Sequence, residues 1–436
     1  KKYLDQAKFF LDARGTTARK DIYLQSHKPV LEQDEAVGHA VRAGYMYSGM
    51  ADVAAITGDS SYVRAIDRIW ENIVGKKIYI TGGIGARHEG EAFGDNYELP
   101  NLTAYNETCA AIGNVYTNYR LFLLHGDAKY FDVLERTLYN GLISGVSLDG
   151  GRFFYPNPLA CDGKYRFNAD HTITRQPWFG CACCPSNISR FIPSLPGYVY
   201  AVKDDKVYVN LFLSNRAKLK VNGKNVVLEQ ETSYPWNGDI RLTVAKGNQP
   251  FVMNVRIPGW VRGSVLPGGL YSYADGEELA YRVSVNGQEV KGALQKGYLS
   301  IDRHWKKGDV VEIHFDMQPR VVKANDKVAA NRGRVAIEHG PLVYCAEWPD
   351  NDFDISTLLL NRHPKFQVVE HPDLLGGINE ITTRAQALSY DATGRLAAKD
   401  VKLTLIPYYA WAHRGEGRME VWLPIEVGAA SAELQE

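Results

Sequence analysis

The stretch PSNISRFIPSLPGYVYAVKDDKVYVNLFLSN, residues 185–215, decides the fold of this chain, because the spacing of its apolar residues changes within it. Before about residue 199 the apolar residues recur at the intervals of an amphipathic helix, whereas KVYVNLFLSN alternates with the period of a β-strand. We therefore predict a helical part before this stretch and a β part after it.

Helical spacing covers most of the residues between the N-terminus and this stretch. It predicts helices at 34–58, 60–75, 103–126, 128–145 and 185–195. Asp59-Ser60 separates the first two and Gly126-Asp127 the next two, so each pair is expected to form an antiparallel helical hairpin.

Toward the C-terminus, the segments FVMNVRIPGW, RVSVNGQEV and VVEIHF keep the period of two, and Asn222-Gly223 and Asn286-Gly287 predict tight hairpin turns. The 436 residues exceed the roughly 250–300 over which one hydrophobic core grows. The predicted fold class is therefore multidomain α plus β, with a helical domain at 1–199, an all-β sandwich at 200–320 and a second β-sandwich at 321–436.

The charge balance narrows the range of partners. Lys and Arg number 50, Asp and Glu also number 50, and no run of like charge stands out. The chain therefore lacks the electrostatic footprint of a nucleic-acid or membrane-surface binder, and no apolar stretch is long enough for a membrane-spanning helix. We expect a soluble protein with a small or neutral partner. The sequence leaves the compartment open between a bacterial-type cytoplasm and periplasm. The sequence carries no signal for an oligomeric state.

The run FGCACCPSN holds three of the six cysteines, and Glu107 and Cys109 lie upstream in AYNETCAAIGN. Adjacent thiols are poorly placed to bridge each other. One interpretation is a zinc site formed by Glu107, Cys109, Cys183 and Cys184, with Cys181 as a substitute ligand, and the other is a set of scattered structural thiols.

Helix geometry limits the metal interpretation. Residues two apart on a helix point about 200° apart, so Glu107 and Cys109 can share a metal only near the start of a helix or through side-chain reach. Pro185 suits the first position of the helix predicted at 185–195. The adjacent thiols would then lie at a helix N-terminus, which lowers the pKa of a thiol.

Two long irregular segments, residues 81–101 and 149–167, interrupt the helices, and loops of this length are usually functional. The first contains HEGEAFGDNYELPN, which either supplies an acid for sugar hydrolysis, with a pKa raised by a partly dry pocket, or is a solvated acidic loop. Its carboxylates are Glu89, Glu91, Asp95 and Glu98. His39, predicted inside a helix beside Gly38, and Tyr155, in the second loop, either pack or contact a ligand.

Several of these motifs occur along the chain in the same order as in a known protein family. GHAVRAGYM, HEGEAFGDNYELPN, AYNETCA, RFFYPNP, CCPSNISR and PYYAWAHRGEG resemble glycoside hydrolase family 127, the zinc-dependent β-L-arabinofuranosidases, from about residue 38 to about 424. The resemblance implies an (α/α)6 barrel followed by β-sandwich domains. The predicted helices make about half of such a barrel, so the chain is expected to hold its C-terminal half. With no initial Met, residue 1 is not expected to be the natural start.

The resemblance also implies roles for individual residues and a reaction. Glu107, Cys109, Cys183 and Cys184 match the family's Zn²⁺ ligands, Cys183 its nucleophile, Glu91 its acid/base, and His39 and Tyr155 its sugar contacts. These roles imply retaining hydrolysis of β-L-arabinofuranosides or related plant cell-wall sugars, with an oligosaccharide or glycoside as substrate.

Three alternatives stay open at the level of sequence. The first is the same fold acting on another rare pectic sugar, and the second is a non-catalytic carbohydrate-binding protein whose zinc is structural. The third is a two-carboxylate glycosidase that uses Glu91 with Glu89 or Asp95, the thiols being incidental.

Overall fold

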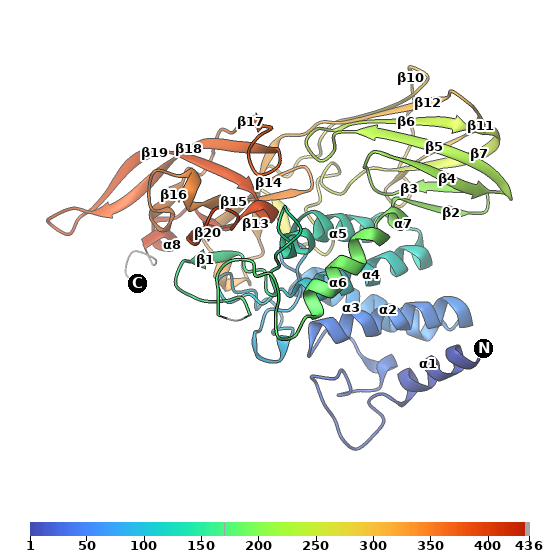
Figure 1. The fold of residues 1–436 in the computed structure, drawn as a ribbon, viewed down its shortest axis with the longest axis horizontal. Coiled ribbons are helices and arrows are strands. Elements are labelled where there is room, and N and C mark those ends of the chain that lie inside the picture. The colour runs from blue at the N-terminus through green and yellow to red at the C-terminus, as the bar shows by residue number, and fades with distance from the viewer. Residues whose placement is uncertain (170, 432–436) are drawn as a thin grey trace.

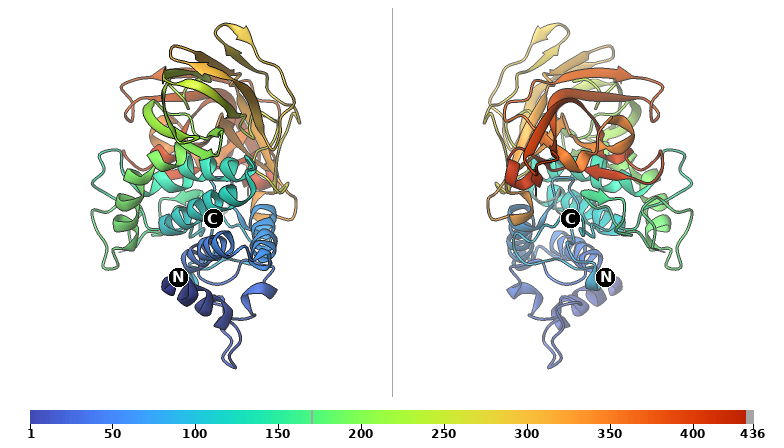
Figure 2. Two further views of the ribbon diagram at one scale, coloured as in Figure 1. Left: turned by 90° about the vertical axis from the view of Figure 1, so that its right-hand side faces the viewer. Right: turned by 90° about the vertical axis from the view of Figure 1, so that its left-hand side faces the viewer.

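A computed structural model describes residues 1–169 and 171–431 and shows a mixed arrangement of helices and sheets (Figure 1). Helices dominate before residue 200 and strands after it, as the change of period predicts. In Figures 1 and 2 the helical part lies below the strands. The helices are α1 (Lys2–Ala13), α2 (Ala40–Thr57), α3 (Ser60–Asn72), α4 (Thr108–His125), α5 (Lys129–Thr137), α6 (Cys183–Phe191), α7 (Pro196–Val199) and α8 (Val427–Ser431).

Two helices begin later than their apolar spacing predicts. Helix α2 begins at Ala40 instead of residue 34, and α4 begins at Thr108 instead of residue 103. Gly38 prevents an earlier start of α2, because it has a φ of +69°, and a Cβ at this position would clash with the carbonyl oxygen of Ile22. His39 is therefore the N-cap of α2, and the prediction that it lies inside the helix is wrong.

The other predicted helices are helical over most of their length but change type at their ends. Helix α3 continues as a π-helical turn at Ile73–Lys77, and α5 continues as another at Leu138–Leu142. Helix α6 begins at Cys183, so Pro185 is its third residue and not the first. The α-helical spacing thus continues into these turns, whose different pitch the apolar pattern did not distinguish.

Helices α2 and α4 cross closely near their N-terminal ends. A Cβ on Gly44 would lie 3.0 Å from the carbonyl carbon of Gly113, which is closer than most Cβ contacts, so glycine favours this approach. Thr117 Oγ1 donates a hydrogen bond of 2.9 Å to the Gly44 carbonyl oxygen. Each helix starts within about six residues of the crossing, roughly 9 Å at 1.5 Å per residue. The crossing therefore brings the two helix starts close together.

Two sheets follow the helical part. The six-stranded sheet has the order β10-β9-β12-β6-β5-β4, and the four-stranded sheet has the order β11-β7-β3-β2. Positive φ angles at Asn222, Gly223, Asn286 and Gly287 confirm the two predicted hairpin turns. The strands are β2 (Tyr200–Lys203), β3 (Lys206–Val209), β4 (Asn215–Val221), β5 (Lys224–Thr232), β6 (Asp239–Lys246), β7 (Asn248–Arg256), β9 (Tyr281–Val285), β10 (Gln288–Glu289), β11 (Tyr298–Lys306) and β12 (Val310–Phe315).

A third, eleven-stranded sheet draws on segments from across the chain. Its main path is β16-β18-β19-β15-β14-β13-β8, to which β1, β17, β20 and β21 attach. Strand β1 comes from the second long loop, and β8 precedes β9 of the six-stranded sheet. The strands are β1 (Ala160–Asp162), β8 (Tyr271–Tyr273), β13 (Pro319–Ala324), β14 (Arg334–His339), β15 (Leu342–Glu347), β16 (Leu358–Leu360), β17 (Gln367–His371), β18 (Ile378–Tyr390), β19 (Leu396–Pro407), β20 (Arg418–Glu420) and β21 (Leu423–Pro424).

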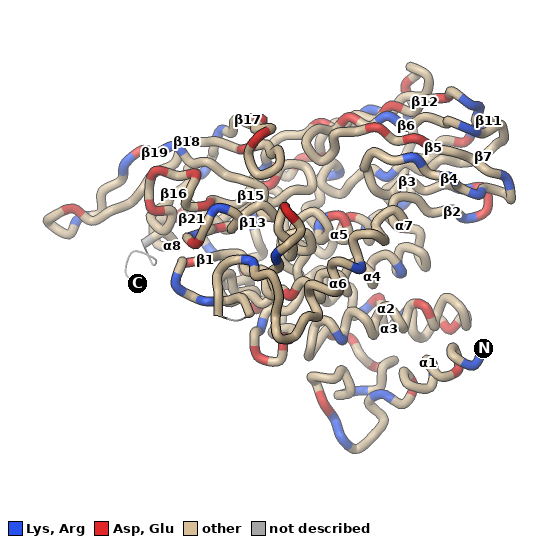
Figure 3. Tube along the Cα trace, in the orientation of Figure 1, with Lys and Arg blue, Asp and Glu red and all other residues tan. Residues whose placement is uncertain are grey.

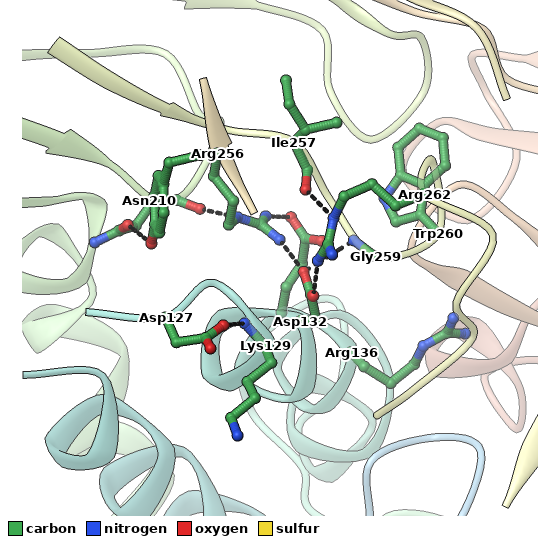
Figure 4. Close-up of polar contacts among 12 residues, drawn as sticks. Asp127, Lys129, Asp132, Arg136, Asn210, Arg256, Ile257, Gly259, Trp260 and Arg262 are labelled. Atoms are coloured by element: carbon green, nitrogen blue, oxygen red, sulfur yellow. Dashed lines mark hydrogen bonds and ion pairs between the residues drawn. The ribbon is translucent and has the colours of Figure 1, made fainter. Parts of the chain in front are cut away.

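Helix α5 connects the helical part to the four-stranded sheet through buried charges (Figure 4). Arg256, at the end of β7, is fully buried and donates to Asp132 Oδ1 at 2.9 Å, to Glu135 and to the Asn210 carbonyl oxygen at 2.6 Å. Arg262 donates to the second oxygen of Asp132 at 2.6 Å. Each buried charge therefore has partners from the other side of this interface.

The same helix also contacts the third sheet. Arg136 forms a buried ion pair of 2.6 Å with Glu338 of β14, and Asn140, just beyond α5, donates a hydrogen bond of 2.9 Å to the Pro341 carbonyl oxygen. Helix α5 thus fixes both β regions against the helical part.

Charged residues of both signs are interspersed along the strands and helices (Figure 3). None of the helices formed by the described residues combines the length and apolarity needed to cross a membrane.

Candidate active site

Four side chains from two helix starts form a compact thiol and carboxylate group. Cys183 Sγ lies 3.6 Å from Cys109 Sγ, 3.9 Å from Cys184 Sγ and 3.4 Å from Glu107 Oε1. The ligand atoms of Glu107, Cys109, Cys183 and Cys184 all lie within 4.8 Å of one another. The structure thus brings together the four residues that the sequence predicts as metal ligands.

The start of α4 removes the geometric difficulty with Glu107 and Cys109. Glu107 is the N-cap of α4 and has extended backbone angles, φ −60° and ψ 137°, while Cys109 lies in the first helical turn. The two side chains therefore do not follow the 200° separation of residues inside a helix. Cys183 and Cys184 open α6, so their thiols do lie at a helix N-terminus, as predicted.

The group is buried and carries an unsatisfied oxygen. Glu107 and Cys109 are each 2% exposed, and Cys184 is fully buried. Cys184 donates to Glu107 Oε1 at 3.3 Å, whereas the buried Oε2 has no hydrogen-bond partner among the described residues. A buried polar atom without a partner is costly, and a bound cation would satisfy it. Three thiols and a carboxylate form a donor set that suits a divalent metal.

The thiols of this group do not share one protonation state. Hydrogen bonds from Cys109 and Cys184 hold the pKa of Cys183 well below its usual value. Burial raises the pKa of Cys184 and that of Glu107, and the contact with Cys183 raises the pKa of Cys109. Cys183 is thus the thiol that is most readily ionised, which is the property of a nucleophile.

Glu91 is held against this group by its loop. Ala92 forms isolated β-bridges with His39 and with Arg87, and Phe93 N donates to the Gly38 carbonyl oxygen at 2.9 Å. His39 Nε2 consequently lies 2.8 Å from Glu91 Oε2. The loop folds back on the N-cap of α2, which places two residues that are far apart in sequence in direct contact.

The protonation of Glu91 differs from the prediction. The hydrogen bond from His39 lowers the pKa of Glu91, against the opposing effect of partial burial, and a hydrogen bond from Tyr105 acts in the same direction. The predicted rise of the pKa is therefore wrong, since the donors that surround this carboxylate stabilise its charged form.

Tyr155 lies beside the proposed nucleophile. Its hydroxyl is 2.7 Å from Cys183 Sγ and 3.6 Å from Cys181 Sγ. Its carbonyl oxygen accepts a hydrogen bond of 3.0 Å from Thr108 N, at the start of α4. The neighbouring Phe154 stacks on Trp411 of the late motif PYYAWAHRGEG, with ring centroids 5.3 Å apart. The C-terminal region thus supports the loop that carries Tyr155.

These side chains line one cavity of about 710 Å³. Its lining includes Cys181 and all the predicted site residues except Cys184, which is fully buried. The other acidic residues of the loop do not line this cavity, and Asp95 and Glu98 pair instead with Arg87 at 3.1 Å and 2.5 Å.

The structure adds residues that sequence reasoning missed. Tyr105 donates to Glu91 Oε1 at 2.9 Å, and Tyr45, Asn187 and Arg190 form a hydrogen-bonded group on the cavity wall. The signal for them was present in AYNETCA and CCPSNISR, which contain Tyr105, Asn187 and Arg190. The sequence interpretation of those motifs concerns their thiols, their carboxylate and Pro185.

Comparison with known proteins gives consistent matches along the chain. Residues 1–197 match the family model described as β-L-arabinofuranosidase, GH127 catalytic domain, residues 206–317 match the GH127 middle domain, and residues 319–424 match the glycoside hydrolase family 127 C-terminal domain. A curated relative, the non-reducing end β-L-arabinofuranosidase of Bifidobacterium longum subsp. longum, is 35% identical over 468 residues, covering 97% of this chain and 68% of the relative.

Solved structures agree with these matches. The GH127 β-arabinofuranosidase BT3674 superposes with a TM-score of 0.95 at 75% identity, covering 98% of this chain and 66% of that one. A GH127 β-L-arabinofuranosidase from Geobacillus stearothermophilus T6 superposes with a TM-score of 0.89 at 40% identity, covering 97% of this chain and 69% of that one. The chain thus spans about two thirds of the length of these relatives.

Proposed function

This chain belongs to glycoside hydrolase family 127, and on that premise we propose that it is a retaining glycosidase acting on β-L-arabinofuranosides with Cys183 as nucleophile and Glu91 as acid/base. One observation carries the proposal. An ionisable thiol, Cys183, and a carboxylate, Glu91, line the same cavity beside a buried group suited to a metal. A nucleophile and an acid/base are the two functions that retaining hydrolysis needs.

We propose Zn²⁺ as the metal, held by Glu107, Cys109, Cys183 and Cys184. The donor set supports this assignment, since three thiols and one oxygen match tetrahedral zinc coordination, and Glu107 Oε2 lacks a partner among the described residues. When bound, zinc would keep the sulfur of Cys183 ionised at neutral pH.

In the first step, Cys183 Sγ attacks the anomeric carbon while Glu91 gives a proton to the glycosidic oxygen. The carbon–oxygen bond breaks, a carbon–sulfur bond forms, and the aglycone leaves as an alcohol. Glu91 must take up a proton first, because the hydrogen bonds from His39 and Tyr105 favour its ionised form. A sugar hydroxyl that engages His39 would weaken the contact with Glu91 and raise its pKa toward the value an acid needs.

In the second step, Glu91 takes a proton from a water molecule, which attacks the anomeric carbon and displaces Cys183 Sγ. Two successive displacements at one carbon retain its configuration. The hydroxyl of Tyr155, 2.7 Å from Cys183 Sγ, would stabilise the negative sulfur both before attack and as it departs.

We propose that the helical part is the C-terminal half of an (α/α)6 barrel and forms a catalytic domain at 1–199, followed by β-sandwiches at 200–320 and 321–436. The family-model matches to a catalytic, a middle and a C-terminal domain support this division.

The substrate assignment predicts a specific product. The zinc-loaded protein is expected to hydrolyse aryl β-L-arabinofuranosides and to release arabinose that first appears as the β-anomer, because two displacements retain configuration. Proton NMR during the first minutes of the reaction resolves the anomers, and aryl glycosides of other pectic sugars serve as controls. Faster turnover of another sugar would reassign the substrate, and sugar binding without any turnover would support a carbohydrate-binding role.

The metal assignment predicts that zinc uptake releases protons. Cys109 and Cys184 have pKa values raised above that of an ordinary thiol and hold protons at neutral pH, and burial shifts the pKa of Glu107 in the same direction. Metal ligation requires that the thiols lose these protons. Zinc affinity should therefore fall as the pH is lowered. Calorimetric titration of metal-free protein in two buffers of different ionisation enthalpy measures the protons released.

The matched control for this titration is Cys181→Ser, since the exposed Cys181 lies outside the ligand group and its loss should leave zinc affinity nearly unchanged. An affinity independent of pH, or one that survives Cys109→Ser, would contradict the proposed ligand set.

A further inference from the structure

Tyr105 makes a hydrogen bond to the acid/base carboxylate from behind the cavity. Its hydroxyl donates to Glu91 Oε1 at 2.9 Å, while His39 Nε2 lies 2.8 Å from Oε2. His39 lines the cavity, whereas Tyr105 is absent from the lining and is 5% exposed. The two oxygens of Glu91 are therefore not equivalent, because Oε1 faces the buried tyrosine and Oε2 faces His39, which lines the cavity.

Glu91 depends on such a contact for its orientation once a sugar hydroxyl engages His39 and weakens the contact with Oε2. It has a φ of +49°, a strained value for a residue with a side chain, and it follows Gly90 with a φ of +69°. Its side chain is about one third exposed. A carboxylate on a loop turn of this kind has rotational freedom unless a partner holds one of its oxygens.

Tyr105 is suited to hold it, because its own position is fixed. Its backbone N donates to the Ala86 carbonyl oxygen at 3.3 Å, and its carbonyl oxygen accepts from Asn157 N at 3.0 Å. Its ring lies edge-on to His88, with centroids 4.9 Å apart. A tyrosine hydroxyl keeps its proton at neutral pH and can therefore donate to a carboxylate.

We propose that Tyr105 is a positioning residue that anchors Glu91 Oε1 and thereby directs Glu91 Oε2 toward the glycosidic oxygen. This inference rests on the proposed role of Glu91 as acid/base. The proton then reaches the aglycone through Oε2, and the hydrogen bond of Tyr105 lasts through both steps. Tyr105 touches neither sugar nor aglycone, so its contribution should depend on how much proton donation the leaving group needs.

The test is the leaving-group dependence of kcat/KM in the zinc-loaded protein, which reports the first chemical step. Tyr105→Phe keeps the ring and removes only the hydroxyl. We expect it to lower kcat/KM for phenyl arabinofuranoside about tenfold to a hundredfold, because the misalignment of Glu91 Oε2 outweighs the easier protonation of Glu91 once this donor is removed. With a dinitrophenyl aglycone, which leaves without protonation, the change should stay within about threefold.

Glu91→Gln, measured in parallel, separates the two claims. If Glu91→Gln shows the same leaving-group dependence but Tyr105→Phe does not, the positioning role is wrong and the acid/base role stands. If Glu91→Gln shows no such dependence, the acid/base assignment itself fails. An equal loss on both aglycones in Tyr105→Phe would indicate a structural role only and would overturn the inference.

Tyr344→Phe provides the matched control, because Tyr344 is a buried tyrosine in β15 whose hydroxyl donates to the Asn379 carbonyl oxygen at 2.9 Å, outside the cavity lining. It should leave the ratio of the two rates unchanged. If Tyr105→Phe does not fold, difluorotyrosine at position 105 keeps the shape and alters the donor strength. It should then change the phenyl rate and not the dinitrophenyl rate, and unchanged rates on both would contradict the proposal.

Discussion

Replacing Cys183 by serine is expected to lower kcat/KM by about 10⁴-fold or more, as for other enzymes that lose their nucleophile. The serine hydroxyl stays protonated at neutral pH, whereas the thiol of Cys183 has a pKa held well below its usual value by its neighbours. Glu91 and the cavity remain in the variant, so the residual rate measures what they achieve without a covalent intermediate. Initial rates on an aryl β-L-arabinofuranoside, with zinc content determined on the same samples, provide the measurement.

Two further variants serve as comparisons for that result. Cys181→Ser removes a thiol two residues away that lies outside the ligand group, and it should retain activity within about tenfold. Cys109→Ser removes a proposed ligand and not the nucleophile, so zinc supplied in excess should partly restore its rate. A Cys183→Ser protein that keeps most of its activity would exclude the thiol mechanism. It would favour a pair of carboxylates, Glu91 and Glu107, whose oxygens lie within 4.8 Å.

The second large effect concerns stability. Arg256→Met is expected to destabilise the interface between α5 and the four-stranded sheet by about 3–5 kcal/mol, because it leaves buried carboxylates without their partner. Arg256 is fully buried, and Asp132 and Glu135 are 8% and 2% exposed. Methionine fills much of the same volume, so the loss reflects charge and not an empty cavity. Urea unfolding followed by tryptophan fluorescence measures it.

The matched control is Arg241→Met, which removes a surface ion pair with Glu312 of 2.7 Å whose side chains are 48% and 52% exposed. Exposed pairs of this kind contribute about 0–1 kcal/mol. The loss in Arg256→Met should also depend on pH. Burial already raises the pKa of Glu135, and removal of Arg256 raises it further, so the variant is least impaired at acidic pH and loses stability as the pH rises. Equal losses in the two variants would contradict a structural role for the buried cluster.

Much of the helical part could be predicted from sequence because apolar spacing reports which face of a helix is buried. The errors fell at helix starts, where the pattern carries little information. The starts of α2 and α4, at the N-caps His39 and Glu107, depend on local backbone angles. At Gly38 these angles depend in turn on the close backbone of Ile22, which the apolar pattern does not report. The attachment of β1 and β8 to the third sheet was beyond prediction for the same reason, since strand pairing is a long-range property.

The site residues were found through motif resemblance, and the structure brings them into contact. Their electrostatics were less accessible. The sequence suggests a raised pKa for a carboxylate in a dry pocket. In the structure, hydrogen bonds from His39 and Tyr105 to Glu91 lower the pKa of this carboxylate. Tyr105 lies in the same short motif as two proposed ligands, yet its role follows only from the fold of the loop around Glu91. A motif indicates which residues form the site, and the structure shows which hydrogen bonds connect them.

The most direct test of the central claim is mass spectrometry of the peptide that contains Cys183 after acid quenching of the reaction during turnover. The account predicts that the Cys183 peptide gains the mass of one pentosyl unit, that the gain is absent without substrate, and that Cys183→Ser abolishes it. A pentosyl group found on Glu91 or Glu107, or continuing turnover with Cys183 never modified, would contradict the account.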